Sequence, residues 1–314
     1  MDYTTLGRTG LKVSVAGLGC GGDSRVGLGV DKSTAEAVRL IRLAVDLGVN
    51  LLDTARNYGT EEVVGAALRE LPKGSVVVSS KLQLRRGATA ESVVTGLDES
   101  LRALGVDCID VYQVHGLLPE DYDYVTAELV PVLLRERDKG KFRFLGVTES
   151  AVKDGNQTMS RRAVRDDCWD VMMLAFHMMH QGIRARVLPH TQAKRIGTMM
   201  MFVVRRLFSM PGRLQEIMAE LAKEGRLPAA LADDPEPLNF LIHQGGAESL
   251  TDAAYRFARH EPGVDVVLFG TSNPDHLRAN IASLLRPPLP AADRERVVRL
   301  FDKLEGVGLD YSTR

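Results

Sequence analysis

The sequence alternates between short apolar runs and longer amphipathic segments. Between residues 35 and 47, apolar side chains recur at three- and four-residue steps and form one face, as is typical of a helix packed on a core. Residues 91–104 show the same spacing, as do residues 125–136, where Pro131 is expected to interrupt the helix. The runs predicted to be strands are residues 13–18, 50–54, 75–82, 108–115, 142–148, 170–177, 196–204 and 264–270.

Several predicted helices begin with residues that satisfy the free backbone N–H groups of a first turn. Ser33 and Glu36 have the spacing of a capping box, as do Ser249 and Asp252. The sequence Asn273-Pro274-Asp275 combines an N-cap, a proline suited to the first helical position and an early acid. These signals place helices between the predicted strands.

Most predicted strands are apolar throughout rather than alternating, which is typical of strands covered on both faces. Eight such strands separated by helices, with no linker rich in Pro, Gly or Ser, predict a single α/β domain over residues 1–314 with the (β/α)8 barrel fold. Residues 3–6 and 11–15 predict a hairpin before the barrel. The interval 205–246 is too long for a simple connection between strands seven and eight, and it holds one amphipathic helix and a turn-rich stretch.

Composition narrows the function classes. The 40 Lys and Arg residues balance 41 Asp and Glu residues, which gives no electrostatic reason to expect a nucleic acid partner. Apolar runs stay shorter than a bilayer requires, so no membrane span is expected. The first residues lack the basic and apolar parts of a secretion signal, and we expect a cytoplasmic protein.

Candidate metal ligands are few. Cys20, Cys108 and Cys168 are far apart and form no Cys-x-x-Cys pair. His177 and His180 lie near Cys168 without a third and fourth ligand at suitable spacing. Packing in the core is the simpler interpretation of both histidines, and no metal is expected.

Four ionisable residues fall where three adjacent predicted strands end. Asp53 ends the second strand and Tyr58 follows it, Lys81 ends the third strand and His115 ends the fourth. In a parallel barrel the carboxyl ends of the strands meet at one mouth, where catalytic groups gather. A phenol titrates near pH 10, and a nearby ammonium stabilises its ionised form. We therefore predict Tyr58 as a proton donor to a carbonyl oxygen, with Lys81 beside it, Asp53 orienting Lys81, and His115 bonding to the substrate oxygen.

None of these four groups attacks the carbonyl carbon, so a cofactor must supply the nucleophile, and hydride from a reduced nicotinamide is the natural candidate. The motifs around them lie along nearly the whole chain. They are Leu6-Gly7-Arg8-Thr9-Gly10, Gly17-Leu18-Gly19, Leu52-Asp53-Thr54-Ala55, Tyr58-Gly59, Ser80-Lys81, Gln113-Val114-His115, Gly146-Val147-Thr148 and Gly270-Thr271-Ser272-Asn273. Together they resemble the aldo-keto reductase family.

The resemblance implies a (β/α)8 barrel that reduces an aldehyde or ketone, a small-molecule carbonyl substrate, with NADP(H) favoured and NAD(H) as the other cofactor. It implies Tyr58, Lys81, Asp53 and His115 as the catalytic tetrad. The cofactor-binding positions that it implies are Gly19, Thr148, Gly270, Thr271, Ser272, Asn273, His276 and Asn280.

The sequence departs from the family pattern in two parts of this implied cofactor site. Gly270 and His276 stand where many members have a lysine and an arginine for the 2′-phosphate of NADP, and we expect Arg278 or the pair Arg205-Arg206 to substitute. Glu149 follows Thr148 where the family usually has asparagine, and Met173 stands at the usual glutamine. Gln181 and the ring of Phe202 are candidates to hold the nicotinamide instead.

Other interpretations stay open. The stretch Gly17 to Gly22 contains the G-x-G-x-x-G spacing of a Rossmann fold, but no helix opens at these glycines, and Asp53 lies too far along. A barrel of this family that binds nucleotide and signals redox state to a partner, with little turnover, is the alternative function. A weak pseudoenzyme is a third, suggested by Glu149 and Met173.

Overall fold

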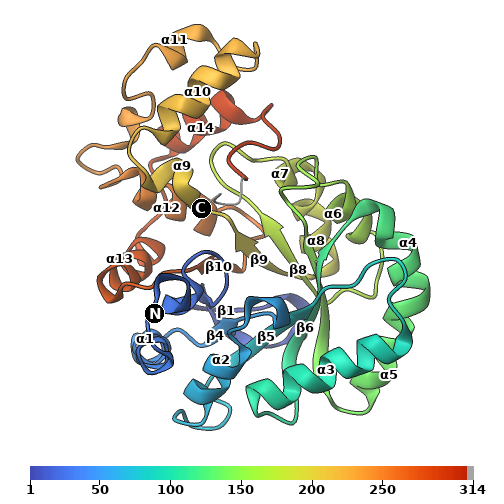
Figure 1. Ribbon diagram of the computed structural model, residues 1–314. Helices are drawn as coiled ribbons and strands as arrows, with labels where there is room; N and C mark the ends of the chain where they lie inside the picture. Colours follow the sequence, from blue (N-terminus) through green and yellow to red (C-terminus); the bar gives the residue numbers. More distant parts are fainter. Residues whose placement is uncertain (310–314) are drawn as a thin grey trace.

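The structure is a computed structural model that describes residues 1–309. Its central element is a closed parallel barrel in the order β10-β3-β4-β5-β6-β7-β8-β9 (Figure 1). The strands are β3 (Ala16–Gly19), β4 (Leu51–Asp53), β5 (Val77–Leu82), β6 (Ile109–Leu117), β7 (Phe142–Glu149), β8 (Val171–Ala175), β9 (Gly197–Met201) and β10 (Val266–Phe269). The predicted (β/α)8 barrel is confirmed. That residues 1–314 form one domain stays a prediction, and its last five residues lie outside the described range.

Helices cover the outside of the barrel. They are α1 (Thr34–Asp46), α2 (Glu61–Leu68), α3 (Ala90–Leu104), α4 (Tyr122–Tyr124), α5 (Val130–Asp138), α6 (Thr158–Ala163), α7 (Ile183–Arg186), α8 (Leu188–Lys194), α12 (Leu250–Arg259), α13 (Pro274–Leu285) and α14 (Ala291–Phe301). Ser33 and Glu36 form both hydrogen bonds of the predicted capping box at α1. Pro131 lies in the first turn of α5, after a π-helical turn at Val125–Leu129, so the interruption predicted there is confirmed.

A hairpin of β1 (Tyr3–Thr5) and β2 (Lys12–Ser14) precedes the barrel. Its Leu6, Leu11 and Val13 pack against inward-facing residues near the starts of the barrel strands, including Leu51 and Val77. The hairpin therefore closes the amino-terminal end of the barrel. The prediction that the first barrel strand begins at residue 13 is wrong, because residues 12–14 pair with β1 and the barrel strand begins only at Ala16.

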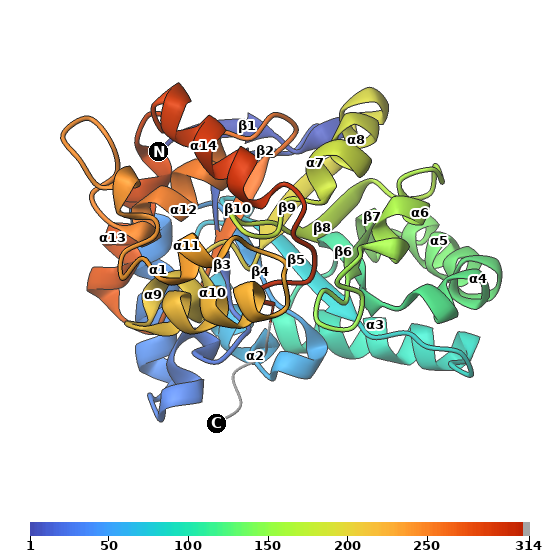
Figure 2. The same ribbon diagram turned by 90° about the horizontal axis from the view of Figure 1, so that it is seen from above.

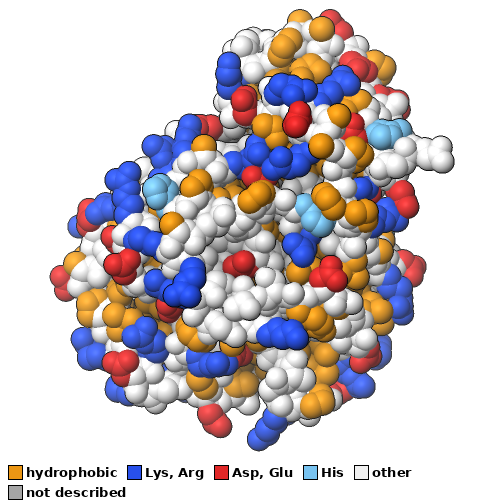
Figure 3. Space-filling model, turned by 180° about the vertical axis from the view of Figure 1, so that it is seen from behind, with side chains coloured by type: hydrophobic (Ala, Val, Ile, Leu, Met, Phe, Trp, Pro, Cys, Tyr) orange, Lys and Arg blue, Asp and Glu red, His pale blue; other side chains and the backbone are white. Residues whose placement is uncertain are grey.

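A long segment connects β9 to β10, as predicted. It contains α9 (Arg205–Ser209), α10 (Arg213–Lys223), α11 (Ala229–Ala232) and a 3-10 turn at Asn239–Leu241, rather than a single helix. The predicted apolar face of α10 is buried. Figures 1 and 2 show this segment on the side of the barrel where the parallel strands end, and it forms the protrusion at the top of Figure 3.

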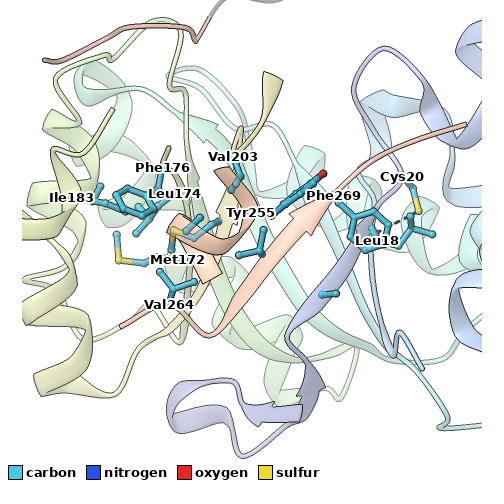
Figure 4. Packing of buried hydrophobic residues seen from close by; sticks show 14 of the residues in the cluster. Leu18, Cys20, Met172, Leu174, Phe176, Ile183, Val203, Tyr255, Val264 and Phe269 are labelled. Atoms are coloured by element: carbon cyan, nitrogen blue, oxygen red, sulfur yellow. Dashed lines mark hydrogen bonds between the residues drawn. The ribbon is translucent and has the colours of Figure 1, made fainter. Parts of the chain in front are cut away.

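The remaining core lies between the strands and the surrounding helices. Figure 4 shows Leu18 packed near Phe269 on one side and Met172, Leu174 and Phe176 on the other. The rings of Phe176 and Phe257 stack with centroids 5.5 Å apart, so apolar contacts fix α12 against the barrel.

The described helices include none long and apolar enough to cross a membrane. The face shown in Figure 3 carries basic and acidic side chains interspersed with one another.

Gly7 and Gly10 offer a test of how tightly the hairpin seals the barrel, since both have positive φ, 48° and 71°. A Cβ on Gly7 would lie 2.6 Å from the carbonyl oxygen of Arg195, whereas a Cβ on Gly10 would meet no atom within 4 Å. Gly7→Ala should therefore lower the free energy of unfolding by more than about 2 kcal/mol, and Gly10→Ala by only about 1 kcal/mol from backbone strain. Urea unfolding measures both decreases in the free energy of unfolding. Equal decreases for the two variants would contradict tight packing of the hairpin against the barrel.

Candidate active site

The four residues predicted as a tetrad lie together at the carboxyl ends of adjacent strands. Asp53 is the last residue of β4, Lys81 lies near the end of β5, and His115 lies in the last third of β6. Tyr58 ends a 3-10 turn at Arg56–Tyr58 that follows β4. The parallel pairing of β4 with β5 and of β5 with β6 brings these ends to one rim.

Asp53 and Lys81 form a buried ion pair. Lys81 Nζ lies 2.7 Å from Asp53 Oδ2 and donates a second hydrogen bond of 2.6 Å to the carbonyl oxygen of Thr54. Lys81 is fully buried, and burial alone would lower the pKa of its ammonium. The charge of Asp53 and the neighbouring Tyr58 outweigh that effect, and the pKa of Lys81 is raised above its ordinary value.

Tyr58 lies between this ion pair and His115. Lys81 Nζ is 5.0 Å from the centroid of the phenol ring, and the Tyr58 hydroxyl is 3.3 Å from His115 Nε2. The Tyr58 and His115 rings meet edge to face, with centroids 5.3 Å apart. The phenol hydroxyl is therefore within hydrogen-bond reach of the imidazole, and the ammonium lies against the phenol ring.

Gly21 packs directly against Tyr58, a contact that sequence reasoning missed. A Cβ on Gly21 would lie 2.7 Å from Cζ of the phenol ring, closer than atoms can approach. The glycine-rich stretch after β3 was the available signal, and its purpose here is to let the backbone approach the ring.

His115 is an uncharged imidazole at neutral pH. Burial, followed by the charges of Lys81 and Arg85, lowers its pKa to about 3. The strand pairing of β6 with β7 is irregular between Val114 and Leu117, and there the N–H of Gly116 donates a 2.6 Å hydrogen bond to the hydroxyl of Thr148 on β7. Thr148, a predicted cofactor contact, thus also holds the backbone beside His115.

The predicted phosphate end of the cofactor site lies where β3 and β10 end side by side. A Cβ on Gly270 would come within 3.3 Å of the carbonyl oxygen of Gly19, so the two glycines lie close together. Thr271 Oγ1 accepts from the N–H of Asn273, and Asn273 Oδ1 accepts from the N–H of Asp275 at the start of α13. The backbone segments at Gly19 and Gly270 lie close together, and the twelve-residue helix α13 begins beside them. Free backbone N–H groups and the helix dipole at such a helix start suit the phosphates of a dinucleotide.

Lys32, which sequence reasoning did not single out, reaches this region from the loop after β3. Its Nζ donates a 2.6 Å hydrogen bond to the carbonyl oxygen of Ser272. Of the other predicted contacts near this end, His276 is exposed and Asn280 is partly buried. Of the expected substitutes, Arg278 is exposed on the same helix, α13, and the guanidinium of Arg205 lies 4.4 Å from the centroid of the Phe202 ring, so their role with the 2′-phosphate stays a prediction.

The nicotinamide end of the site departs from the family pattern in its bonding. Glu149 is buried, and its carboxyl accepts from the Ser160 hydroxyl at 2.6 Å and from the N–H of Ala175. Met173 lies in the apolar barrel interior. The amide of Gln181, a candidate to hold the nicotinamide instead, donates to the carbonyl oxygens of Met178 and Val297.

His177 and His180 have structural partners. His177 Nε2 donates to the carbonyl oxygen of Val307, and His180 Nδ1 accepts from the N–H of Gly306. Residues 1–309 contain no cluster of three or more His, Cys, Asp or Glu side chains that could hold a metal ion.

Glu149 should make stability fall as the pH rises. Burial raises its pKa from 4.5 to about 7, so the folded state binds its proton more tightly than the unfolded chain does. Glu149→Gln keeps an acceptor for Ala175 and removes the titration. The free energy of unfolding of the variant, measured by urea unfolding, should rise relative to that of the unaltered protein by roughly 3 kcal/mol when the pH is raised from 4 to 8. Glu62→Gln, at an exposed position, is the control, and a Glu149→Gln difference that does not change with pH would contradict this.

Comparisons with known proteins agree with the fold and with the chemistry expected of it. The sequence model of the Aldo/keto reductase family matches residues 18–301. The chain is 29% identical to the aldo-keto reductase YhdN of Bacillus subtilis over 89% of this chain and 87% of that protein. It is 25% identical to the L-galactose dehydrogenase of Arabidopsis thaliana over 98% and 95% of the two chains.

Among solved structures, an aldo-keto reductase from Bacillus halodurans in its holo form shares the fold, with a TM-score of 0.72 at 21% identity. The match covers 99% of this chain and all of that one. With the barrel, the rim of strand ends and a family match over nine-tenths of the sequence in place, the chain belongs to the aldo/keto reductase family of nicotinamide-dependent oxidoreductases.

Proposed function

We propose that this protein reduces an aldehyde or ketone to an alcohol with NAD(P)H, with Tyr58 as the proton donor. The convergence of the Tyr58 hydroxyl, His115 Nε2 and the buried Lys81–Asp53 pair is the observation that carries the proposal. Each of these groups suits one part of a carbonyl reduction, and none of them is a nucleophile for carbon.

In this proposal the bound nicotinamide supplies a hydride to the carbonyl carbon. His115, held neutral, forms a hydrogen bond through Nε2 to the carbonyl oxygen, where negative charge develops. Tyr58 transfers its hydroxyl proton to that oxygen, and the nearby Lys81 ammonium stabilises the phenolate left behind. Asp53 keeps Lys81 charged and in place.

Replacing Tyr58 with phenylalanine tests the proposed proton donor. Purified protein with NADPH or NADH and 4-nitrobenzaldehyde should oxidise the nucleotide, and Tyr58→Phe should lower kcat at least about 100-fold because only the hydroxyl is removed. Nucleotide dissociation constants, measured by calorimetry, should stay unchanged. Equal rates in the two proteins would reject the role of Tyr58.

NADP(H) is the favoured cofactor, with NAD(H) as the alternative, and Lys32 supports this preference. Within residues 1–309 it makes no ion pair with an acidic side chain, and its ammonium lies beside Ser272 near the start of α13. Gly270 and His276 stand where many members of the family have a lysine and an arginine, and the partly buried Lys32 places an ammonium beside the start of α13. A 2′-phosphate there gains a charge-assisted hydrogen bond.

Lys32→Met should therefore raise the dissociation constant of NADPH about tenfold or more, because the ammonium would contact only the 2′-phosphate. The dissociation constant of NADH should stay the same. Titration calorimetry with both nucleotides gives the ratio of dissociation constants. Lys73→Met, at an exposed position in the loop before β5, is the matched control, and Arg278→Met tests the other expected substitute. A Lys32→Met ratio equal to that of the unaltered protein would assign the preference to other residues.

The alternative function is a nucleotide-dependent redox sensor with little turnover. Slow turnover with every carbonyl tested, together with tight nucleotide binding and nucleotide-dependent capture of a partner protein, would distinguish the sensor from the reductase. The bonding of Glu149 and the apolar setting of Met173 favour the third function, a weak pseudoenzyme, since the usual partners of the carboxamide are absent from these positions. Failure to bind either nucleotide by calorimetry would support the pseudoenzyme.

A further inference from the structure

The polar network at the mouth continues downward into the barrel interior. Asp53 uses its second carboxyl oxygen, Oδ1, to accept a 2.8 Å hydrogen bond from the hydroxyl of Ser79. Ser79 Oγ in turn accepts a 2.8 Å hydrogen bond from Nε2 of Gln113. Ser79, Gln113 and Asp53 are all buried, with exposed fractions of 0%, 1% and 3%. Side-chain hydrogen bonds thus connect Asp53 of the tetrad to Ser79 on β5 and Gln113 on β6, which lie one layer below Lys81 and His115.

Strand periodicity places this layer beneath the catalytic groups. Ser79 and Lys81 are two residues apart on β5, and Gln113 and His115 are two residues apart on β6, so each pair faces the same side of its strand. Gly146 on β7 pairs with Gln113 and leaves room for it, because a Cβ there would lie 2.8 Å from Cγ of Gln113. The interior is shaped to admit the Gln113 side chain.

The hydrogen bonds have only one consistent direction. An ionised Asp53 is purely an acceptor, so the Ser79 hydroxyl must donate to it. Ser79 Oγ can then accept a hydrogen bond, and the Nε2 group of Gln113 donates it. Because Asp53 Oδ2 bonds Lys81 and Oδ1 bonds Ser79, the carboxylate is fixed from both sides.

We propose that Ser79 and Gln113 are positioning residues that hold Asp53 ionised and oriented toward Lys81, and through Lys81 set the proton chemistry of Tyr58. The proposal rests on the carbonyl reduction proposed above. The hydrogen bond from Ser79 opposes the rise that burial causes in the pKa of Asp53, so its loss should make Asp53 easier to protonate.

The titratable groups around the pair come from four elements. Lys81 is on β5, Tyr58 is in the turn after β4, His115 is on β6, and Cys20 follows β3. Burial raises the pKa of the Cys20 thiol and burial lowers that of His115, so both are neutral over the working pH range. Glu149, at the nicotinamide end of the site, also titrates, but it is the same in every variant, so a shift of the acid limb between variants reports the protonation of Asp53.

Ser80 provides a matched control. It is the next residue of β5, equally buried, and its hydroxyl also donates to a buried carboxylate, at 2.5 Å to Glu61 Oε1. Because successive side chains of a strand point to opposite faces, this bond lies on the outside of the barrel, toward α2. Ser79→Ala and Ser80→Ala remove the same group from the same strand on different faces.

The test is the pH profile of kcat/KM for 4-nitrobenzaldehyde at saturating NADPH. Ser79→Ala should move the acid limb up by about one pH unit and lower kcat about tenfold, with the NADPH dissociation constant unchanged. Gln113→Leu should shift the limb in the same direction by less, Ser79→Thr should restore it, and Ser80→Ala should leave it unchanged. Equal profiles for Ser79→Ala and Ser80→Ala would overturn the proposal.

A second readout does not depend on turnover. The ¹³C signal of the Asp53 carboxyl, followed by NMR in the nucleotide-free protein, should titrate at higher pH in Ser79→Ala than in Ser80→Ala. If the unaltered protein reduced no carbonyl, the proposed function would fail, while this titration would still test the positioning role. An unchanged Asp53 titration in Ser79→Ala would end it.

Discussion

The structure depends on keeping a lysine ammonium charged inside a protein. Lys81 has no exposed surface, and an isolated ammonium in that position would lose several kcal/mol of hydration, roughly what a few good hydrogen bonds return. Asp53 and the Thr54 carbonyl supply those bonds from the neighbouring strand. The parallel barrel makes this possible, because it places the ends of β4, β5 and β6 at one rim and orients successive interior residues in layers.

The two ends of the barrel have different tasks. Leu6, Leu11 and Val13 of the hairpin fill the amino end with apolar contacts, so the polar layers begin only above them. At the other end, non-glycine residues with positive φ follow three of the strands, among them Val26 after β3, Gln157 after β7 and Phe202 after β9, whereas Arg195 is such a residue beside the hairpin. Such conformations are costly away from glycine and gather where loops are shaped for a site. Stability is thus concentrated at one end and chemistry at the other.

Strand periodicity and motif spacing predicted the barrel, the hairpin, the long segment before β10 and the tetrad positions, since these follow from local patterns and from the rule that strand ends share a mouth. Lys32 escaped prediction because its partner, the Ser272 carbonyl, lies 240 residues away in sequence. The contact of Gly21 with Tyr58 and the hydrogen bonds of Ser79 and Gln113 were not predicted for the same reason, because side-chain contacts between strands leave no periodic signal in the sequence. Gln181 looked available in sequence, and only the packing of α14 and its neighbours showed its amide engaged by backbone.

The most direct measurement is the titration of Lys81 itself. In protein labelled with ¹⁵N-lysine, with the Lys81 signal assigned by its loss in Lys81→Arg, the Nζ resonance should keep the shift of an ammonium at pH values where the exposed lysines have begun to lose their protons, because Asp53 raises the pKa of Lys81. A Lys81 signal that lost its proton below the exposed lysines would show that burial outweighs Asp53, and would contradict the account.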